Sequence, residues 1–411
     1  MRILHTSDWH TGRKLKERSR LEEFGQFFAW LEDIIINEHI DALIVSGDIF
    51  DNTAPSPKAQ ELYYSFLGRL SNSPCRHAVI ISGNHDSAIF IDAPSEIMKH
   101  CRVHVVGRTC DNPADEVITL TDAEGNPELI VCAVPYLHDK DIRIVKADDD
   151  PGDIERALKS GIMRHYAEVT GHARELRGAS NVPIIAMGHL FLEHGMTLED
   201  EGVRSLYVGT AVKVGTDIFP EDIAYTALGH LHSPQHIGRE NIRYSGSPIA
   251  MTFGEASGRK SVSIVELEGR NFAGVREITV PVFQRLERLS GTIQEIENGI
   301  ISLGHEGISV WLEVTYTGSE AIGDLQERFE DCAKVFPNID ILSVRDEGSS
   351  NIEAGGTGIF GGKSLDNVSP EGMFRYLMDS KDIPKGQRDV FMKMYMEILH
   401  GIRTGDNDTV Q

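Results

Sequence analysis

The sequence predicts an α/β fold in which a second sheet packs on the first, followed by a small α+β domain. Three observations support this fold class. Over the first 190 residues, short β-rich apolar runs alternate with turns that hold acidic or histidine residues and with helical patterns. After about residue 200 the pattern changes to shorter strands with few helices. The chain of 411 residues is also too long for one ordinary core, which favours two or three domains.

The apolar runs place the expected elements of the first domain, residues 1–283. A strand at residues 2–6 is followed by a helix in which apolar residues recur at helical spacing from Leu21 to Ile35. Further strands are expected at residues 42–46, 77–82, 129–134, 184–187, 225–228, 241–245, 261–267 and 275–282. Several end directly in a Gly-Asp, Gly-Asn or Gly-His pair. Ligands in α/β sheets gather beyond the carboxyl ends of strands, so these polar residues are expected to meet.

The rest of the chain divides into three segments. Residues 284–347 are expected to form the α+β domain, with helices at 293–303 and 321–336 and strands at 310–315 and 339–344. Residues 348–367 carry six glycines and are expected to be a flexible linker. Residues 368–403 show apolar stripes at three- and four-residue steps, which are typical of helices with one apolar face. These faces either dock on a partner or pack back on the preceding domain.

Composition limits the classes of function. The five cysteines are odd in number and never occur as C-x-x-C, which argues against a disulfide framework and a thiolate zinc site. No apolar run reaches the roughly 18 to 20 residues that span a bilayer, and the N-terminal residues turn polar too soon for a secretory signal. A cytoplasmic protein without membrane contacts is therefore expected. The formal charge of -23 disfavours a broad nucleic-acid footprint.

Five short motifs rich in Asp, His and Asn occur at the predicted strand ends. They are Asp8-Trp9-His10, Gly47-Asp48-Ile49-Phe50-Asp51, Gly83-Asn84-His85-Asp86, Gly188-His189 and Gly229-His230-Leu231-His232. One such motif alone is more typical of a turn or a cap, but five in this setting indicate a metal site. Imidazole nitrogen mixed with oxygen ligands suits manganese, iron, zinc or nickel. Seven candidate ligands exceed the need of one tetrahedral zinc and fit two ions that share a carboxylate.

These motifs resemble the pattern of the calcineurin-like metallophosphoesterases, which is D-x-H, G-D-x-x-D, G-N-H-D/E, G-H and G-H-x-H. The resemblance implies a four-layer αββα sandwich and a two-metal phosphoesterase site. It implies that one ion is held by Asp8, His10, Asp48 and His232 and the other by Asp48, Asn84, His189 and His230. Asp48 would bridge the ions, whereas His10 could also lie just outside the ligand shell in some metal states.

The same resemblance implies that His85 is the catalytic histidine, which protonates the leaving oxygen, and that Asp51 orients its imidazole. A histidine is the natural general acid near neutral pH, and a carboxylate partner fixes its tautomer. Asp86 could compete for this orienting role.

Longer blocks of sequence around the motifs resemble the SbcD branch of this family, the nuclease subunits of bacterial DNA repair exonucleases. The blocks are residues 5–12, 82–87, 227–232 and 244–248. This resemblance implies hydrolysis of DNA phosphodiesters, as double-strand exonuclease and single-strand endonuclease, with two Mn²⁺ per subunit, although Mg²⁺, Fe²⁺ or Zn²⁺ could occupy the site. It also implies that residues 284–347 form a capping domain that helps to place DNA. The terminal helices would dock on an SbcC-type coiled-coil ATPase, with a homodimer inside a heterotetramer.

The choice of substrate depends partly on a basic stretch after the first motif. Arg13, Lys14, Lys16, Arg18 and Arg20 lie close together with one acid, Glu17, between them. The stretch could bind a phosphate backbone, although a solvated start of a helix is an equally good interpretation. The main alternative function is a phosphodiesterase or phosphatase that acts on a small nucleotide or phosphomonoester. A non-catalytic scaffold is a further alternative, which the complete ligand set disfavours.

Overall fold

The computed structural model describes residues 1–142, 151–197, 212–319 and 324–347, together with Phe374, Arg388, Met392 and Tyr395. The predicted linker at 348–367 lies outside these residues, as does the predicted partner-binding segment at 368–403 apart from the four named side chains. Phe374 and Tyr395 are helical, and their rings stack with centroids 4.0 Å apart. The two predicted apolar stripes therefore meet at this pair, while docking on a partner stays a prediction.

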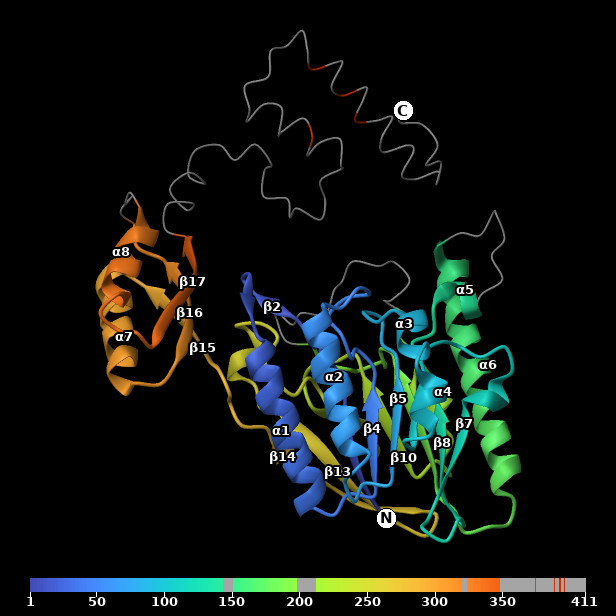
Figure 1. Ribbon diagram of the computed structural model, residues 1–411. Helices are drawn as coiled ribbons and strands as arrows, with labels where there is room; N and C mark the ends of the chain where they lie inside the picture. Colours follow the sequence, from blue (N-terminus) through green and yellow to red (C-terminus); the bar gives the residue numbers. More distant parts are fainter. Residues whose placement is uncertain are drawn as a thin grey trace, which may run out of the picture. The chain divides into compact units, whose positions relative to one another are not determined.

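Two six-stranded sheets form the body of the first 280 residues (Figure 1). The first sheet has the order β14 (Asn271–Thr279), β13 (Ser261–Glu268), β1 (Arg2–Thr6), β4 (Ala42–Ser46), β5 (His77–Ile81) and β6 (Val103–Val106). The second has the order β11 (Gln235–Ile237), β12 (Arg239–Tyr244), β10 (Tyr225–Gly229), β9 (Ile184–His189), β8 (Pro127–Ala133) and β7 (Val117–Thr121). β1, β4, β5 and β6 are parallel, as are β8, β9, β10 and β12.

Alternating side chains of each strand divide the core into layers. In the first sheet, Ile3 and Ile44 point between the sheets, whereas Leu4 and Val45 pack against helices on the outer face. That outer face is covered by α1 (Leu21–Asn37) and α2 (Pro57–Leu70), and the outer face of the second sheet by α6 (Pro151–Arg177). The order helix, sheet, sheet, helix confirms the predicted αββα fold class. Among the described helices, none has the length and apolarity to cross a membrane.

Short helices connect the main elements. They are α3 (Ala88–Asp92), α4 (Ser95–Lys99), α5 (Asp139–Ile142) and the 3-10 turns η1 (Pro113–Glu116), η2 (Thr216–Ile218) and η3 (Glu255–Ser257). α3 begins directly after the Gly83-Asn84-His85-Asp86 motif, where the Ser87 side chain caps it by accepting from the Phe90 amide. This cap ends the motif loop and returns the chain to regular structure.

A separate three-stranded sheet follows residue 284. Its order is β15 (Arg285–Gly291), β16 (Val310–Tyr316) and β17 (Ile339–Asp346), and it carries α7 (Ile293–Glu306) and α8 (Leu325–Ala333). α7 begins at a capping box between Thr292 and Glu295 and ends at Gly307, whose φ of 71° no side chain adopts easily. These elements lie where the α+β domain is predicted. Its role as a cap stays a prediction.

Two local expectations differ from the structure. β14 ends at Thr279 instead of reaching residue 282, because Pro281 has no N–H with which to continue a ladder. The basic stretch forms the hairpin β2 (Lys14–Leu15) and β3 (Arg18–Ser19), so the interpretation as the start of a helix is wrong. Lys16 and Glu17, with φ values of 47° and 64°, reverse the chain between the two strands.

Candidate metal centre

The seven predicted ligands lie on loops that leave the carboxyl ends of five parallel strands. The loop after β1 carries Asp8 and His10, and the loops after β4 and β5 carry Asp48 and Asn84. The other three lie in the second sheet: His189 is the last residue of β9, and His230 and His232 follow β10. Main-chain hydrogen bonds join the first two loops, from the Asp8 amide to the Gly47 carbonyl at 3.0 Å and from the His10 amide to the Asp48 carbonyl at 2.9 Å.

The backbone at this edge is strained at several of the predicted ligands. Asp8, His10, Asp48 and His230 have φ values of 51°, 48°, 50° and 101°, in a region that costs a non-glycine residue roughly 1–3 kcal/mol. The neighbouring glycines make this arrangement possible. A Cβ on Gly83 would lie 2.1 Å from Oδ1 of Asp48, so no other residue fits there without moving the carboxylate.

Asp48 lies between the two predicted ligand sets. Its Oδ2 atom is 3.5 Å from Nε2 of His10 on one side and 3.4 Å from Nε2 of His189 on the other. Its Oδ1 atom accepts the main-chain N–H of His85 at 2.9 Å, which fixes the orientation of the carboxylate. The bridging position that the sequence predicts for Asp48 is therefore the position at which the structure places it.

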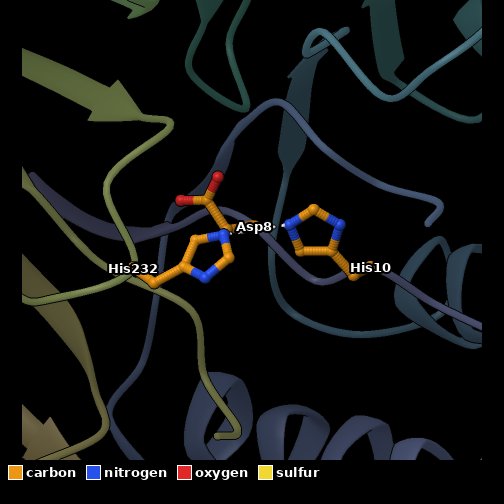
Figure 2. A group of neighbouring side chains, drawn as sticks. All are labelled: Asp8, His10 and His232. Carbon is orange, nitrogen blue, oxygen red and sulfur yellow. Dashed lines mark hydrogen bonds between the residues drawn. The ribbon is translucent and has the colours of Figure 1, made fainter. Parts of the chain in front are cut away.

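The first set joins the two ends of the fold. The ligand atoms of Asp8, His10 and His232 lie within 4.8 Å of one another and are buried (Figure 2). Nε2 of His10 is 3.1 Å from Nε2 of His232, shown by the dashed line in Figure 2. The Asp8 carboxylate is held by the Ser7 hydroxyl at 2.6 Å and by the main-chain N–H of His230 at 2.9 Å.

The second set is centred on Asn84. Its Oδ1 atom lies 3.0 Å from Nε2 of His189 and 3.1 Å from Nδ1 of His230. On the far side of its ring, His189 donates from Nδ1 to the Ser46 carbonyl at 2.9 Å. That contact leaves a lone pair on Nε2, directed at Asn84 and Asp48.

The donor set fits cations better than it fits a hydrogen-bonded polar core. Nε2 of His189 is an acceptor in the neutral ring, yet it faces the acceptor oxygens of Asp48 and Asn84. His10 repeats the pattern, because its Nε2 faces that of His232 and its buried Nδ1 has no hydrogen-bond partner among the described residues. Converging lone pairs are unfavourable unless a cation lies between them. Nitrogen and oxygen donors of this kind suit Mn²⁺, Fe²⁺ or Zn²⁺.

Electrostatics keep these groups in forms that bind metals. Burial would raise the pKa of Asp48, but the charge of His189 and its hydrogen bond hold that pKa well below its usual range. Burial lowers the pKa of His230 to about 3, and the nearby charge of His189 adds to the effect. Against burial, the Asp48 carboxylate raises the pKa of His189 to about 9, the response expected where a positive charge is stabilised. A carboxylate and neutral imidazoles are the ligand forms of a metal centre.

His85 lies beside both sets, and its ring centroid is 4.8 Å from that of His10. The expected contact with Asp51 is present, but it is made by the main chain. Nδ1 of His85 is 2.9 Å from the Asp51 carbonyl oxygen. The Asp51 carboxylate instead accepts from Arg13 at 3.2 Å and lies 3.7 Å from Nδ1 of His10. The expectation of a carboxylate partner for His85 is therefore corrected, because the turn after Asp48 aims the carbonyl at the ring.

Asp86 does not take the orienting role. Its carboxylate accepts three main-chain N–H groups, from Ile49 at 3.0 Å, Phe50 at 2.9 Å and Gly83 at 2.9 Å. Asp86 thereby ties the loop after β4 to the loop after β5. It fixes the relative position of Asp48 and His85 without touching the His85 ring in any described contact.

Of the five basic residues near the centre, Arg20 is buried and unsuited to bind DNA. It forms a two-pronged contact with Glu23 and donates to the Ala250 carbonyl. The prediction that Arg20 binds a phosphate backbone is therefore corrected. The side chains of Lys14, Lys16 and Arg18 are 59%, 41% and 54% exposed, and that of Arg13 is 18% exposed, beside Asp51.

Comparisons with known proteins agree with this geometry. Residues 1–256 match the family described as calcineurin-like phosphoesterase, and residues 282–381 match the family described as type 5 capsule protein repressor C-terminal domain. The chain is similar to the SbcD component of the nuclease SbcCD from Escherichia coli strain K12, with 30% identity over 97% of this chain and 98% of the relative. It is 36% identical to the protein of that name from Rhodobacter capsulatus, over 68% and 69% of the two chains, and 35% identical to that from Bacillus subtilis, with the same coverage.

Proposed function

The chain belongs to the calcineurin-like phosphoesterases and, within them, to the SbcD family of nuclease subunits, and from this we propose that it hydrolyses DNA phosphodiesters at a two-manganese centre. The family makes it a metal-dependent phosphodiesterase. Double-strand exonuclease and single-strand endonuclease action, in repair, recombination and the processing of hairpins during replication, is the activity that we propose.

One observation carries the proposal. The seven predicted ligands form two sets that meet at a single atom, Oδ2 of Asp48. Each set contains nitrogen and oxygen donors, and the side chains of Asp8, His10, Asp48 and His232 are buried. Such an arrangement suits two divalent ions that share one carboxylate oxygen. When bound, the ions would polarise the phosphate and lower the pKa of a bound water.

The chain itself supplies proton transfer and orientation. Because Nδ1 of His85 donates to the Asp51 carbonyl, its Nε2 atom is the one available to protonate the leaving oxygen. The Asp48 contact to the His85 amide fixes the distance between the bridging carboxylate and this proton donor. The left-handed backbone at Asp8, His10 and Asp48 stores strain at the site, as preorganised active sites do.

DNA as substrate is supported by family membership and by the basic hairpin. Lys14, Lys16 and Arg18 lie on the loop that leaves the first metal motif, with much of each side chain exposed. Their neighbours Glu17, Glu313 and Asp340 compensate part of this charge. We therefore propose that the isolated chain binds DNA weakly and that the ATPase partner supplies further positive surface.

An SbcC-type coiled-coil ATPase is the partner that we propose, in a heterotetramer that contains a homodimer of this chain. The names of the relatives describe a subunit of a two-component nuclease, and the match to the E. coli protein covers 97% of this chain. The stacked rings of Phe374 and Tyr395 would belong to the helices that dock on this partner.

A panel of substrates tests the proposal. The chain, alone and co-purified with the coiled-coil ATPase encoded in the same genome, is assayed with Mn²⁺ on duplex DNA, single-stranded DNA, cyclic nucleotides and phosphomonoesters. We expect degradation of DNA that the ATPase and ATP increase. Good hydrolysis of the small esters without any degradation of DNA would contradict the proposal and favour the small-nucleotide alternative.

A further inference from the structure

Glu255 lies directly behind His232, on the side of the ring away from His10. It is the first residue of η3 and is fully buried. Its Oε1 atom is 2.9 Å from Nδ1 of His232. A carboxylate can only accept, so Nδ1 carries the hydrogen and Nε2 is left with a lone pair directed toward the first ligand set.

The other oxygen of Glu255 is held by three donors. Oε2 accepts from Nζ of Lys260 at 2.6 Å, from the Met251 amide at 3.1 Å and from the Ser247 hydroxyl at 3.2 Å. Lys260 also donates to the His232 carbonyl at 3.2 Å. A buried carboxylate is stable when it is paired and fully hydrogen-bonded, and Glu255 meets both conditions. Its position and its ionised form are therefore fixed before any ion binds.

The predicted ligand histidines differ in this respect. His189 donates from Nδ1 to a neutral carbonyl, that of Ser46. Nδ1 of His10 is 3.7 Å from the nearest Asp51 oxygen, which is too long for a hydrogen bond. Among the described contacts of the predicted ligand histidines, only His232 has a carboxylate at hydrogen-bonding distance from its ring. The two ligand sets are thus unequal behind the ligands themselves.

We propose that Glu255 is a positioning residue that fixes the tautomer of His232 and raises its basicity, and so sets the metal affinity of the Asp8, His10, Asp48 and His232 set selectively. A carboxylate behind a ligating imidazole raises the basicity of the metal-bound nitrogen. The second set, which lacks such a carboxylate in the described structure, is unaffected. This inference rests on the proposed two-ion function.

Manganese titration of the metal-free full chain tests the inference. Glu255→Gln keeps the shape of the side chain and removes its charge. Its matched control is Glu116→Gln, because Glu116 is also fully buried and accepts from a histidine, His165, at 2.8 Å and from a main-chain N–H, that of Cys110, at 2.8 Å. Free Mn²⁺ is followed by electron paramagnetic resonance, and protein folding by circular dichroism.

We expect Glu255→Gln to weaken one of the two Mn²⁺ affinities by roughly 10- to 100-fold and to leave the other at its wild-type value. Glu116→Gln should leave both affinities unchanged. Two unchanged affinities in Glu255→Gln would overturn the inference. An equal loss at both sets would also overturn it, because that result indicates a general structural role.

A second measurement needs no variant of Glu255 to fold. In the wild-type chain loaded with Zn²⁺ and labelled with ¹⁵N-histidine, we expect the Nδ1–H proton of His232 to resonate further downfield than that of His189 and to exchange slowly. A fast-exchanging His232 proton would overturn the inference. If the wild-type chain binds two ions but degrades no DNA, the proposed function fails alone. If it degrades DNA and Glu255→Gln binds both ions normally, only the inference fails.

Discussion

Nδ1 of His85 lies 2.9 Å from the main-chain carbonyl oxygen of Asp51. This contact makes Nδ1 the donor to the protein and leaves Nε2 as the atom that exchanges a proton with substrate. Asp51 lies three residues after Asp48 on the loop that follows β4, so one short loop positions both the bridging carboxylate and the proton donor. Asp51 acts on His85 through its backbone.

The first prediction concerns the Asp51 side chain. Asp51→Ala removes the carboxylate but keeps the carbonyl, and it breaks a partly exposed ion pair with Arg13 that is worth about 1 kcal/mol or less. We expect kcat on a nitrophenyl phosphodiester to stay within about tenfold of the wild-type value. A loss as large as that of His85→Ala would mean that the carboxylate takes part in proton transfer.

The second prediction concerns His85 itself. Removal of a general acid typically costs roughly 10²- to 10⁴-fold in rate, so His85→Ala should lose that much kcat on DNA. It should lose far less on a bis-nitrophenyl ester, because nitrophenolate is a weak base that leaves without a proton. Bound Mn²⁺ is measured in parallel and should not change. Equal losses on both substrates would contradict the role of proton donor.

The third prediction tests the shared carboxylate. Asp48→Asn should weaken both Mn²⁺ sites, because Oδ2 of Asp48 faces His10 and His189 alike. Asp8→Asn should weaken mainly one, because the Asp8 carboxylate is predicted to belong to the first set only. Equilibrium dialysis against Mn²⁺ gives the two affinities in each variant. If Asp48→Asn affects only one site, Asp48 does not bridge.

The fourth prediction concerns stability against pH in the metal-free protein. Burial, followed by the charge of Arg243, lowers the pKa of His5 to about 3 from 6.5. The neutral ring stabilises the fold fully above pH 6.5, and this contribution is lost as the pH falls from 6.5 toward 3, by up to about 1.4 kcal/mol per pH unit.

The variant His5→Asn does not titrate in this range. Urea unfolding between pH 7 and pH 4 should therefore show a shallower pH dependence for His5→Asn than for the wild-type protein, whatever its absolute stability. Parallel pH profiles for the two proteins would show that His5 is not held neutral in the fold.

The fifth prediction concerns the basic hairpin. If Lys14 and Lys16 contact phosphates, Lys14→Gln with Lys16→Gln should weaken binding of DNA and reduce the slope of log K against log salt by roughly 0.9 per contact. Turnover of a nitrophenyl phosphodiester should be unchanged. Lys99→Gln is the control, because Lys99 is a similarly exposed lysine on α4, paired with Glu96. An unchanged salt slope in the double variant would exclude the hairpin as a DNA contact.

The fold class was predictable because its main strands are apolar runs that end in polar motifs. β4, for example, is the fully buried run Ala42–Ser46, and Asp48 follows it at once. The short strands β6 and β7 are absent from the prediction, since four or five residues leave little periodicity to detect. The hairpin at Lys14–Ser19 was also missed. Its turn uses Lys16 and Glu17 in left-handed conformations, without the usual Gly or Asn.

Within the site, the sequence motifs name residue types but not the atoms that they present. The motif Gly47-Asp48-x-x-Asp51 cannot reveal that Asp51 contacts His85 through its carbonyl, because that depends on the path of the loop. Glu255 shows a second limit. It lies 23 residues after His232 and outside the motifs, so only tertiary packing brings the two together.

A crystal of the protein soaked in Mn²⁺ and measured for anomalous scattering tests the central claim most directly. The account predicts two anomalous peaks on either side of the Asp48 carboxylate. One should lie beside Asp8, His10 and His232, and the other beside Asn84, His189 and His230. A single peak, or two peaks that do not both contact Asp48, would contradict the claim of a two-metal centre that shares this carboxylate.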